Sequence, residues 1–328
     1  MRNQTQLANP CARPVPRQRQ GGSTLSSMGR WGDDEKSALV ALLRTRPSGM
    51  SWPEITAEVA DTGSALRVWE AHLEPSLFAE PDDALHSAHA DVTAWSAQDF
   101  EFLTFYDDRY PAQLREVHQM PPVLFTRGHL VPDDKAVSVV GSRRASDEAL
   151  ANATAIATEL AKAGLTVLSG LAEGIDTAAH VAALASGART VAIIGTGIEK
   201  SYPPSNRDLQ AEISRRGLVI SQFWPDATPS KQSFPMRNAT MSAYGRATIV
   251  VEASEKSGTR IQARVAVAHG RPVILMDSVA RGTKWGNALV GEPGVFTART
   301  PEEAVERAHD LATEPDDLTY LLTAAKDL

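Results

Sequence analysis

The dominant pattern in the chain is an alternation of short apolar runs with helical segments, from Ala136 to Leu275. The apolar runs read AVSVV, TVLS, TVAII, LVIS, ATIVV and PVIL, and most segments between them carry apolar residues at helical spacing. Nearly continuous Val/Ile runs that are joined by helical crossovers are typical of parallel strands buried on both faces. The pattern therefore predicts an α/β fold with a doubly wound, mostly parallel sheet.

The first crossover, from Val137 to Asp176, contains a candidate phosphate-binding turn. Its apolar run stops at Gly141, and a helical pattern begins behind Ser146. Backbone N–H groups at a helix start carry partial positive charge, and Arg143 and Arg144 add full charges beside them. The alternative is that the glycine only tightens the turn and both arginines are solvated.

The other strand ends also carry small and polar residues. In doubly wound sheets, ligands bind beyond the carboxyl ends of the strands. Two later segments that each precede or begin a predicted helix, Phe234–Asn238 and Ser257–Thr259, add further anion-binding positions. The candidate set for DNA or phosphate binding is Gly141, Ser142, Arg143, Arg144, Ser169, Gly170, Gly174, Gly195, Gly197, Arg237, Asn238, Ser257, Gly258 and Thr259.

Four further residues have two interpretations each. Asp176 either caps the helix that follows it or accepts a hydrogen bond from a ribose hydroxyl, and capping is preferred. His180 is interpreted as a packing histidine, because two ligands do not make a metal site. Tyr202 either stacks on a base or closes its loop. Glu252 ends a strand and could serve as a base, yet no nucleophile or paired carboxylate is fixed near it.

Charge and composition divide the chain into four parts. The net charge is −7, but residues 101–300 carry 22 bases against 19 acids, so a polyanion can bind there. Residues 1–30 are predicted to be a disordered leader, 31–100 an acidic helical module, 101–300 a Rossmann-like domain whose first strands dock on the sheet edge, and 301–328 an acidic helical tail. The single cysteine excludes an internal disulfide and a cysteine-based zinc site. No segment resembles a signal peptide or a membrane span, so a cytoplasmic location without membrane insertion is expected.

Taken in order, the polar motifs resemble the DNA-processing protein A family (DprA/Smf). The segments that carry the resemblance are YPAQL, PPVLF, VVGSRRAS, LSGLAEGIDTAAH, GTG, YPPSN, FPMRN and VVEASEKSGT, over about residues 100–280. The resemblance implies an extended Rossmann-like fold and a homodimer that binds single-stranded DNA without catalysis or a cofactor. It also implies a role in placing a RecA-type recombinase on that DNA, typically during natural transformation and recombination. On this view Gly141, Ser142 and Arg143 cradle a phosphate, Arg237 and Asn238 form a second wall, and the turn from Ser257 closes the pocket.

Three positions depart from the family pattern. A basic residue is usual where this chain has Glu173 and common at Met236, and a second arginine is usual at Ala239. Fewer phosphate contacts should weaken DNA binding. The departures keep a second hypothesis open, namely a nucleotide sensor or a nucleotide phosphoribohydrolase that resembles the plant LOG proteins and uses Glu252. A third is a paralogue that mainly contacts proteins through its acidic module.

Overall fold

The computed structural model describes residues 31–72 and 81–313. The predicted disordered leader and residues 314–328 of the predicted tail lie outside the described residues. Within the described residues, none of the helices combines the length and the hydropathy that crossing a bilayer requires.

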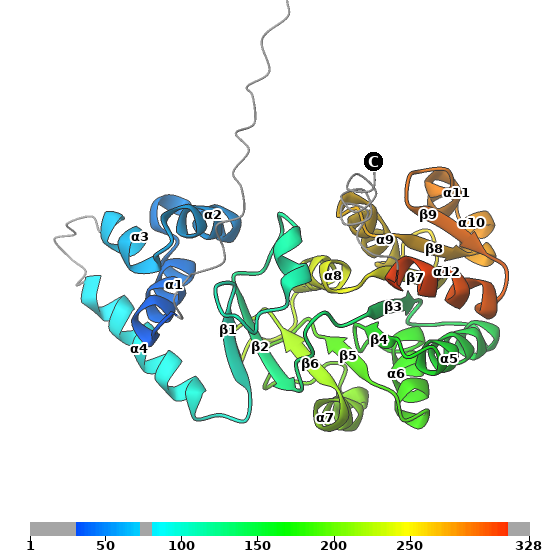
Figure 1. Ribbon diagram of the computed structural model, residues 1–328, viewed down its shortest axis with the longest axis horizontal. Helices are drawn as coiled ribbons and strands as arrows, with labels where there is room; N and C mark the ends of the chain where they lie inside the picture. Colours follow the sequence, from blue (N-terminus) through cyan, green and yellow to red (C-terminus); the bar gives the residue numbers. More distant parts are fainter. Residues whose placement is uncertain (1–30, 73–80, 314–328) are drawn as a thin grey trace, which may run out of the picture. The chain divides into compact units, whose positions relative to one another are not determined.

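The described residues contain a nine-stranded sheet in the order β1-β2-β6-β5-β4-β3-β7-β8-β9 (Figure 1). Strands β3 to β9 pair in parallel, whereas β1 and β2 form an antiparallel edge that adds to β6. The bounds are β1 Glu101–Thr104, β2 Val123–Gly128, β3 Ala136–Gly141, β4 Thr166–Ser169, β5 Thr190–Ile193, β6 Leu218–Ser221, β7 Ala247–Glu252, β8 Val273–Met276 and β9 Val295–Ala298. The predicted doubly wound, mostly parallel sheet is thereby confirmed, and its six predicted runs are β3 to β8. Strand β9 was not predicted.

Helices cover both faces of the sheet because neighbouring residues of each strand point to opposite sides. Val137 and Val139 of β3 pack in one apolar layer with α5, α6 and α12, whereas Val140 packs in the other layer with α8 and α9. The bounds are α5 Asp147–Lys162, α6 Ile175–Ala185, α7 Arg207–Arg216, α8 Ser233–Tyr244, α9 Thr259–Ala268, α10 Asp277–Gly282, α11 Lys284–Leu289 and α12 Pro301–Thr313.

Within the described residues four α-helices precede the sheet, and side chains of three of them contact β2 or Trp224. The four helices are α1 Asp33–Thr45, α2 Trp52–Thr62, α3 Ala65–Ala71 and α4 Pro81–Ser96. The Trp95 ring of α4 lies 4.9 Å from the Phe125 ring of β2, edge to face, and the Trp52 ring of α2 lies 5.6 Å from that of Trp224. The Arg44 guanidinium lies 5.0 Å from the centre of the Trp224 ring. Ring pairs of this geometry are stabilising, so α1, α2 and α4 pack against β2 and the segment after β6.

Candidate nucleic-acid interface

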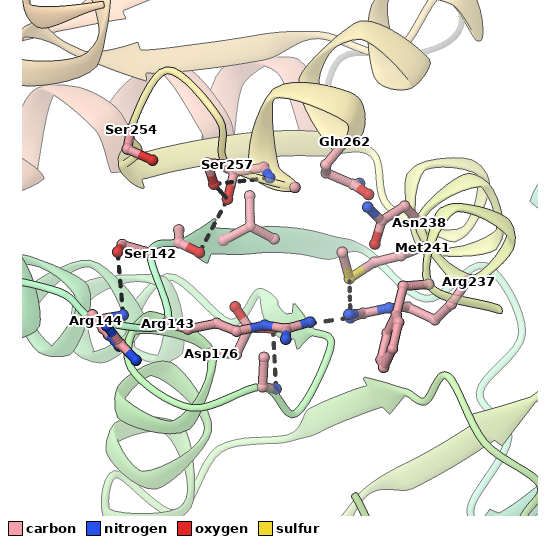
Figure 2. A pocket seen from close by; sticks show the side chains of 16 residues that line it. Ser142, Arg143, Arg144, Asp176, Arg237, Asn238, Met241, Ser254, Ser257 and Gln262 are labelled. Atoms are coloured by element: carbon pink, nitrogen blue, oxygen red, sulfur yellow. Dashed lines mark hydrogen bonds and ion pairs between the residues drawn. The ribbon is translucent and has the colours of Figure 1, made fainter. Parts of the chain in front are cut away.

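A cavity of about 520 Å³ opens at the carboxyl ends of β3 and β7. The chain proceeds from β3 toward β6 in one direction and from β7 toward β9 in the other, so this is the topological switch point of the sheet. The cavity is lined by the loop after β3, one side of α8, and the start of α9 (Figure 2). The structure therefore brings the three main predicted segments together at one place.

Two glycines let the loop after β3 lie directly against its neighbours. An added methyl group at Gly141 would lie 2.6 Å from Ile175 Cγ1 and 2.9 Å from the Glu252 carbonyl oxygen. Gly174 has a φ of +78°, which disfavours side chains, and a methyl group there would lie 2.3 Å from the Ser142 carbonyl oxygen. The close approach of these segments fixes the path of the loop that carries Arg143.

Arg143 and Arg144 provide positive charge at the mouth of the cavity. The Arg143 guanidinium carbon lies 5.2 Å from the centre of the Phe234 ring, a cation–π arrangement that orients the side chain. Figure 2 shows Arg143 extending from the loop toward Arg237. The Arg144 backbone N–H donates to Ser142 Oγ at 3.2 Å, which braces the turn.

Hydroxyl groups at the start of α9 hold the loop before that helix against β3. Ser257 Oγ donates to Thr259 Oγ1 at 2.9 Å and accepts from the Thr259 N–H at 3.1 Å. Thr259 Oγ1 in turn donates to the Gly141 carbonyl oxygen at 3.0 Å. With Gly258, these residues place the positive end of the α9 dipole at the cavity wall.

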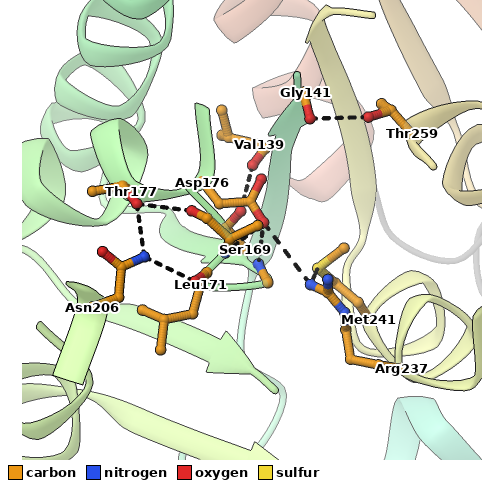
Figure 3. A network of polar contacts seen from close by, with 12 residues as sticks. Val139, Gly141, Ser169, Leu171, Asp176, Thr177, Asn206, Arg237, Met241 and Thr259 are labelled. Carbon is orange, nitrogen blue, oxygen red and sulfur yellow. Dashed lines mark hydrogen bonds and ion pairs between the residues drawn. The ribbon is translucent and has the colours of Figure 1, made fainter. Parts of the chain in front are cut away.

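A buried ion pair between Asp176 and Arg237 forms part of the cavity wall. Figure 3 shows the pair and its neighbours. Arg237 Nη1 lies 3.9 Å from Asp176 Oδ2 and 3.9 Å from Met241 Sδ. Asp176 Oδ2 also accepts from the backbone N–H groups of Gly170 at 3.1 Å and Ala172 at 3.3 Å. Burial raises the pKa of the Asp176 carboxyl, while the Arg237 charge opposes that rise. Burial likewise lowers the pKa of the Arg237 guanidinium.

This pair differs from the arrangement predicted from the sequence. Arg237 lies inside α8, which begins at Ser233 rather than at Ala239, because a proline such as Pro235 is tolerated in a first helical turn. Arg237 is only 6% exposed and lies in the wall rather than at a helix start. Asp176 bonds the preceding loop and does not cap α6, whose N-cap is Gly174.

His180 is a packing histidine, as preferred from the sequence. Its Nδ1 lies 2.7 Å from Thr190 Oγ1, and that hydroxyl donates to the Val167 carbonyl oxygen. Nδ1 is therefore the donor, and the ring is neutral because burial lowers the pKa of His180 to about 3. Among residues 31–72 and 81–313, no group of three or more His, Cys, Asp or Glu side chains is placed to hold a metal ion.

Glu252 is hydrogen-bonded to the start of α5. Its Oε2 accepts from Ser146 Oγ at 2.6 Å and from the Ser146 backbone N–H at 3.2 Å. The residue does not line the cavity. Its carboxylate therefore positions the N-cap of α5, and no described contact points it at a sugar.

A smaller cavity of about 80 Å³ adjoins the first and shares Arg143, Phe234 and Arg237 with it. Gly170, Gly195 and Tyr202 line this smaller cavity. The Tyr202 ring is 40% exposed and lies 5.7 Å from that of Phe234, so it borders the cavity and also packs on its loop. The other candidate residues line neither cavity: they are Ser169, Gly174 and Gly197.

Position 197 requires a glycine because the backbone of Trp224 and Pro225 packs directly against it. A methyl group there would lie 2.2 Å from the backbone carbonyl oxygens of both Trp224 and Pro225. We expect Gly197→Ala to lower the free energy of unfolding by about 1–3 kcal/mol, because backbone atoms must move to admit the methyl group. Denaturant titration measures the change. The matched control is Gly282→Ala, where an added methyl group meets no atom within 4 Å; equal stability of the two variants would contradict the prediction.

Comparison with known proteins identifies the family. The family model described as DNA recombination-mediator protein A matches residues 101–307, which is more than half of the chain. The chain belongs to the DNA recombination-mediator protein A family. This membership confirms the resemblance to DprA/Smf proteins that the ordered motifs indicated.

Relatives within the family resemble this chain over part of their length. The DNA processing protein DprA of Streptococcus pneumoniae is 38% identical over 200 residues, which cover 61% of this chain and 70% of the relative. The Smf protein of Synechocystis is 38% identical over 178 residues, 53% of this chain and 45% of the relative.

Solved structures of family members have the same fold. The structure of DNA processing protein A from Streptococcus pneumoniae matches with a TM-score of 0.67 and 28% identity, over 88% of this chain and all of that one. DNA processing protein A from Helicobacter pylori, in work on its single-stranded DNA binding mode, matches with a TM-score of 0.57 and 25% identity, over 65% of this chain and 96% of that one.

Several residues that line the larger cavity were not among the predicted binding residues, although Phe234 begins a predicted segment. Phe234, Met241, Ser254 and Gln262 all contribute to its wall. Met241 follows Arg237 by four residues, so the two share a helix face once α8 is known to contain both. The four-residue spacing of Arg237 and Met241 therefore indicates a shared helix face, but only if α8 is known to begin before Arg237.

The three departures from the family pattern occupy different surroundings. Glu173 lies on the wall of the smaller cavity and accepts from Ser205 Oγ at 3.2 Å. Met236 is 41% exposed, whereas Ala239 is buried. Only Glu173 among them lines one of the two cavities, where it adds a negative charge near Arg143.

Proposed function

We propose that this protein binds single-stranded DNA at the cavity between β3, α8 and α9, as a binding protein rather than an enzyme. The proposal depends on one observation: Arg143, Arg144, Arg237 and the N-terminus of α9 lie together at one edge of the sheet. A polyanion is the ligand that such a set of charges and N–H groups favours. The work on the Helicobacter pylori relative, which concerns single-stranded DNA binding, supports the same ligand.

The three arginines have different roles in this proposal because they differ in exposure. Arg143 and Arg144 donate to phosphate oxygens at the cavity mouth, since they come from the loop that faces it. Arg237 is buried and acts through its charge and through the loop that Asp176 holds. Residues in the deeper part of the cavity wall contact the bases.

The family description supports a further part of the proposal. A recombination mediator delivers a recombinase to DNA, so we propose that the bound strand is passed to a RecA-type recombinase during DNA uptake or recombination, with the protein acting as a homodimer. Light scattering tests the dimer by giving twice the mass of the chain. Recombinase assembly on DNA, followed with and without this protein, tests the delivery.

Nothing in the described part of the chain favours the nucleotide phosphoribohydrolase hypothesis. The glutamate that this reaction would require, Glu252, is hydrogen-bonded to Ser146 outside the cavity. Release of free base from nucleoside monophosphates by the purified protein, lost in Glu252→Gln, would contradict the proposal that it is not an enzyme.

The principal test is a salt titration of DNA binding. If Arg143 and Arg144 each neutralise one phosphate, log affinity should fall with log salt at a slope of about −1.4, so that affinity drops about sevenfold between about 50 and 200 mM salt. Fluorescence anisotropy with a labelled oligo(dT) strand gives the slope, and a duplex of equal length is the comparison. Absence of binding, or binding that ignores salt, would contradict the proposal.

A further inference from the structure

Two side-chain amides in the cavity wall have no hydrogen-bond partner. Gln262 of α9 is 1% exposed, and both its Nε2 and its Oε1 are buried and unpaired. Asn238 of α8 is 9% exposed and makes no side-chain hydrogen bond within residues 31–72 and 81–313, but unlike Gln262 its amide atoms keep access to solvent in the cavity. Figure 2 shows both amides on the same side of the cavity, where α8 and α9 meet.

Unpaired polar groups at such depth indicate a ligand. A buried amide that has given up water without gaining a partner destabilises the fold, and nearly all buried polar groups in proteins are paired. The Nε of Arg237, in the same wall, is also buried and unpaired. The wall thus offers two amides, each with one acceptor and one donor group, together with one cationic donor.

These groups complement the edge of adenine that points away from its sugar. Adenine presents the acceptor N1, the two N6 amino hydrogens and the acceptor N7 along one continuous edge. One amide can pair with N1 and N6 while the second pairs with N6 and N7, as Asn and Gln do when they recognise adenine. Cytosine and thymine can satisfy only one amide in this way. Guanine can satisfy a second amide only through N2 and N3, on the side next to the sugar, because its N7 edge presents two adjacent acceptors.

We propose that Gln262 and Asn238 read the identity of a base, and that they make this site prefer adenine. The inference rests on the proposed binding of single-stranded DNA and adds sequence preference to it. The phosphate contacts of Arg143 carry no sequence information, so any preference must come from the deeper wall. Either a DNA strand or a free nucleotide could supply the adenine ring. We propose that the ring belongs to a DNA strand.

The wild-type protein alone provides the first test. We expect an oligo(dT) strand with one central dA to bind about tenfold more tightly than all-dT, which corresponds to about one two-point amide contact. Strands with one central dC or dG should bind as all-dT does. Replacing the adenine by an analogue with carbon in place of N7, or by purine without the N6 amino group, should abolish the gain. Equal salt-dependent binding of every strand would overturn the inference and leave the proposed function intact, whereas no binding of any strand would overturn both.

Variants then assign the preference to residues. Gln262→Leu should remove most of the tenfold gain for dA, measured as the ratio of affinities for the dA strand and for all-dT within the same variant. Gln113→Leu is the matched control, because Gln113 is also buried with an unpaired Nε2 but does not line the cavity. A preference that survives in Gln262→Leu, with the fold intact by circular dichroism, would overturn the role of this residue.

A competition experiment distinguishes the two sources of adenine. Free dAMP should displace the labelled dA strand only at concentrations far above those of the unlabelled strand, because the strand adds phosphate contacts beyond the first. If dAMP competes as well as the strand, the amides serve a free nucleotide, and the assignment to DNA is wrong.

Discussion

Replacing Arg143 with alanine is expected to weaken binding of single-stranded DNA about 10- to 150-fold, the effect of losing one charge-assisted contact of about 1.5–3 kcal/mol. Arg143 comes from the loop after β3, lines both cavities, and is oriented by the Phe234 ring. The salt slope should also decrease by about 0.7, because one fewer phosphate is neutralised. Anisotropy titrations of the variant at several salt concentrations measure both quantities.

The matched control for Arg143→Ala is Arg215→Ala. Arg215 lies on α7, pairs with Glu212, and lines neither cavity. Its removal should change DNA binding by less than twofold, as an exposed charge far from the ligand does. If the two variants lose affinity equally, binding depends on the general charge of the protein, and the assigned site is wrong.

Replacing Arg237 with methionine is expected to reduce the free energy of unfolding by about 3–5 kcal/mol at neutral pH. Methionine has a similar length but no charge, so the variant leaves Asp176 buried without its cation. Urea or guanidinium titration gives the loss. A loss below about 1 kcal/mol would show that the two N–H groups of Gly170 and Ala172 are sufficient for this carboxylate.

The pH dependence of Arg237→Met separates the buried charge from simple packing. Burial raises the pKa of Asp176, so the folded protein holds this proton more tightly than the unfolded chain does. The contribution of Asp176 to stability therefore falls as pH rises from its ordinary range through the raised folded value. Without Arg237 that pKa rises further, so the deficit of the variant relative to wild type should shrink as the pH is lowered toward about 4. Adding Asp176→Asn should restore much of the stability at neutral pH.

The sheet could be predicted from the sequence because most of its strands are unbroken apolar runs. Strands buried on both faces, such as β3 and β7, show no alternation to confuse with a helix. Strand β9 was missed because Val295–Ala298 is short and half-buried at three of its four positions. An edge strand of that kind carries little apolar signal.

The candidate site was predictable where a motif lies on a strand end, and unpredictable where a contact joins distant segments. Gly141 ends β3, Arg143 follows it, and the turn at Ser257 follows β7, so parallel topology alone brings them together. The Asp176–Arg237 pair depends on the close packing of α6 and α8 against one strand end. Gln262 could not be found from the sequence, because an unpaired amide is a property of its surroundings.

The attachment of α1, α2 and α4 to β2 and the segment after β6 has a practical consequence. Trp52 and Trp95 lie against Trp224 and Phe125, and Arg44 lies over the Trp224 ring. A fragment that starts at β1 would lack these helices, so the Trp224 and Phe125 rings would be exposed to solvent. Exposed apolar surface of this kind promotes self-association. Oligomers of such a fragment would therefore reflect association through this newly exposed apolar surface and not the assembly of the full chain.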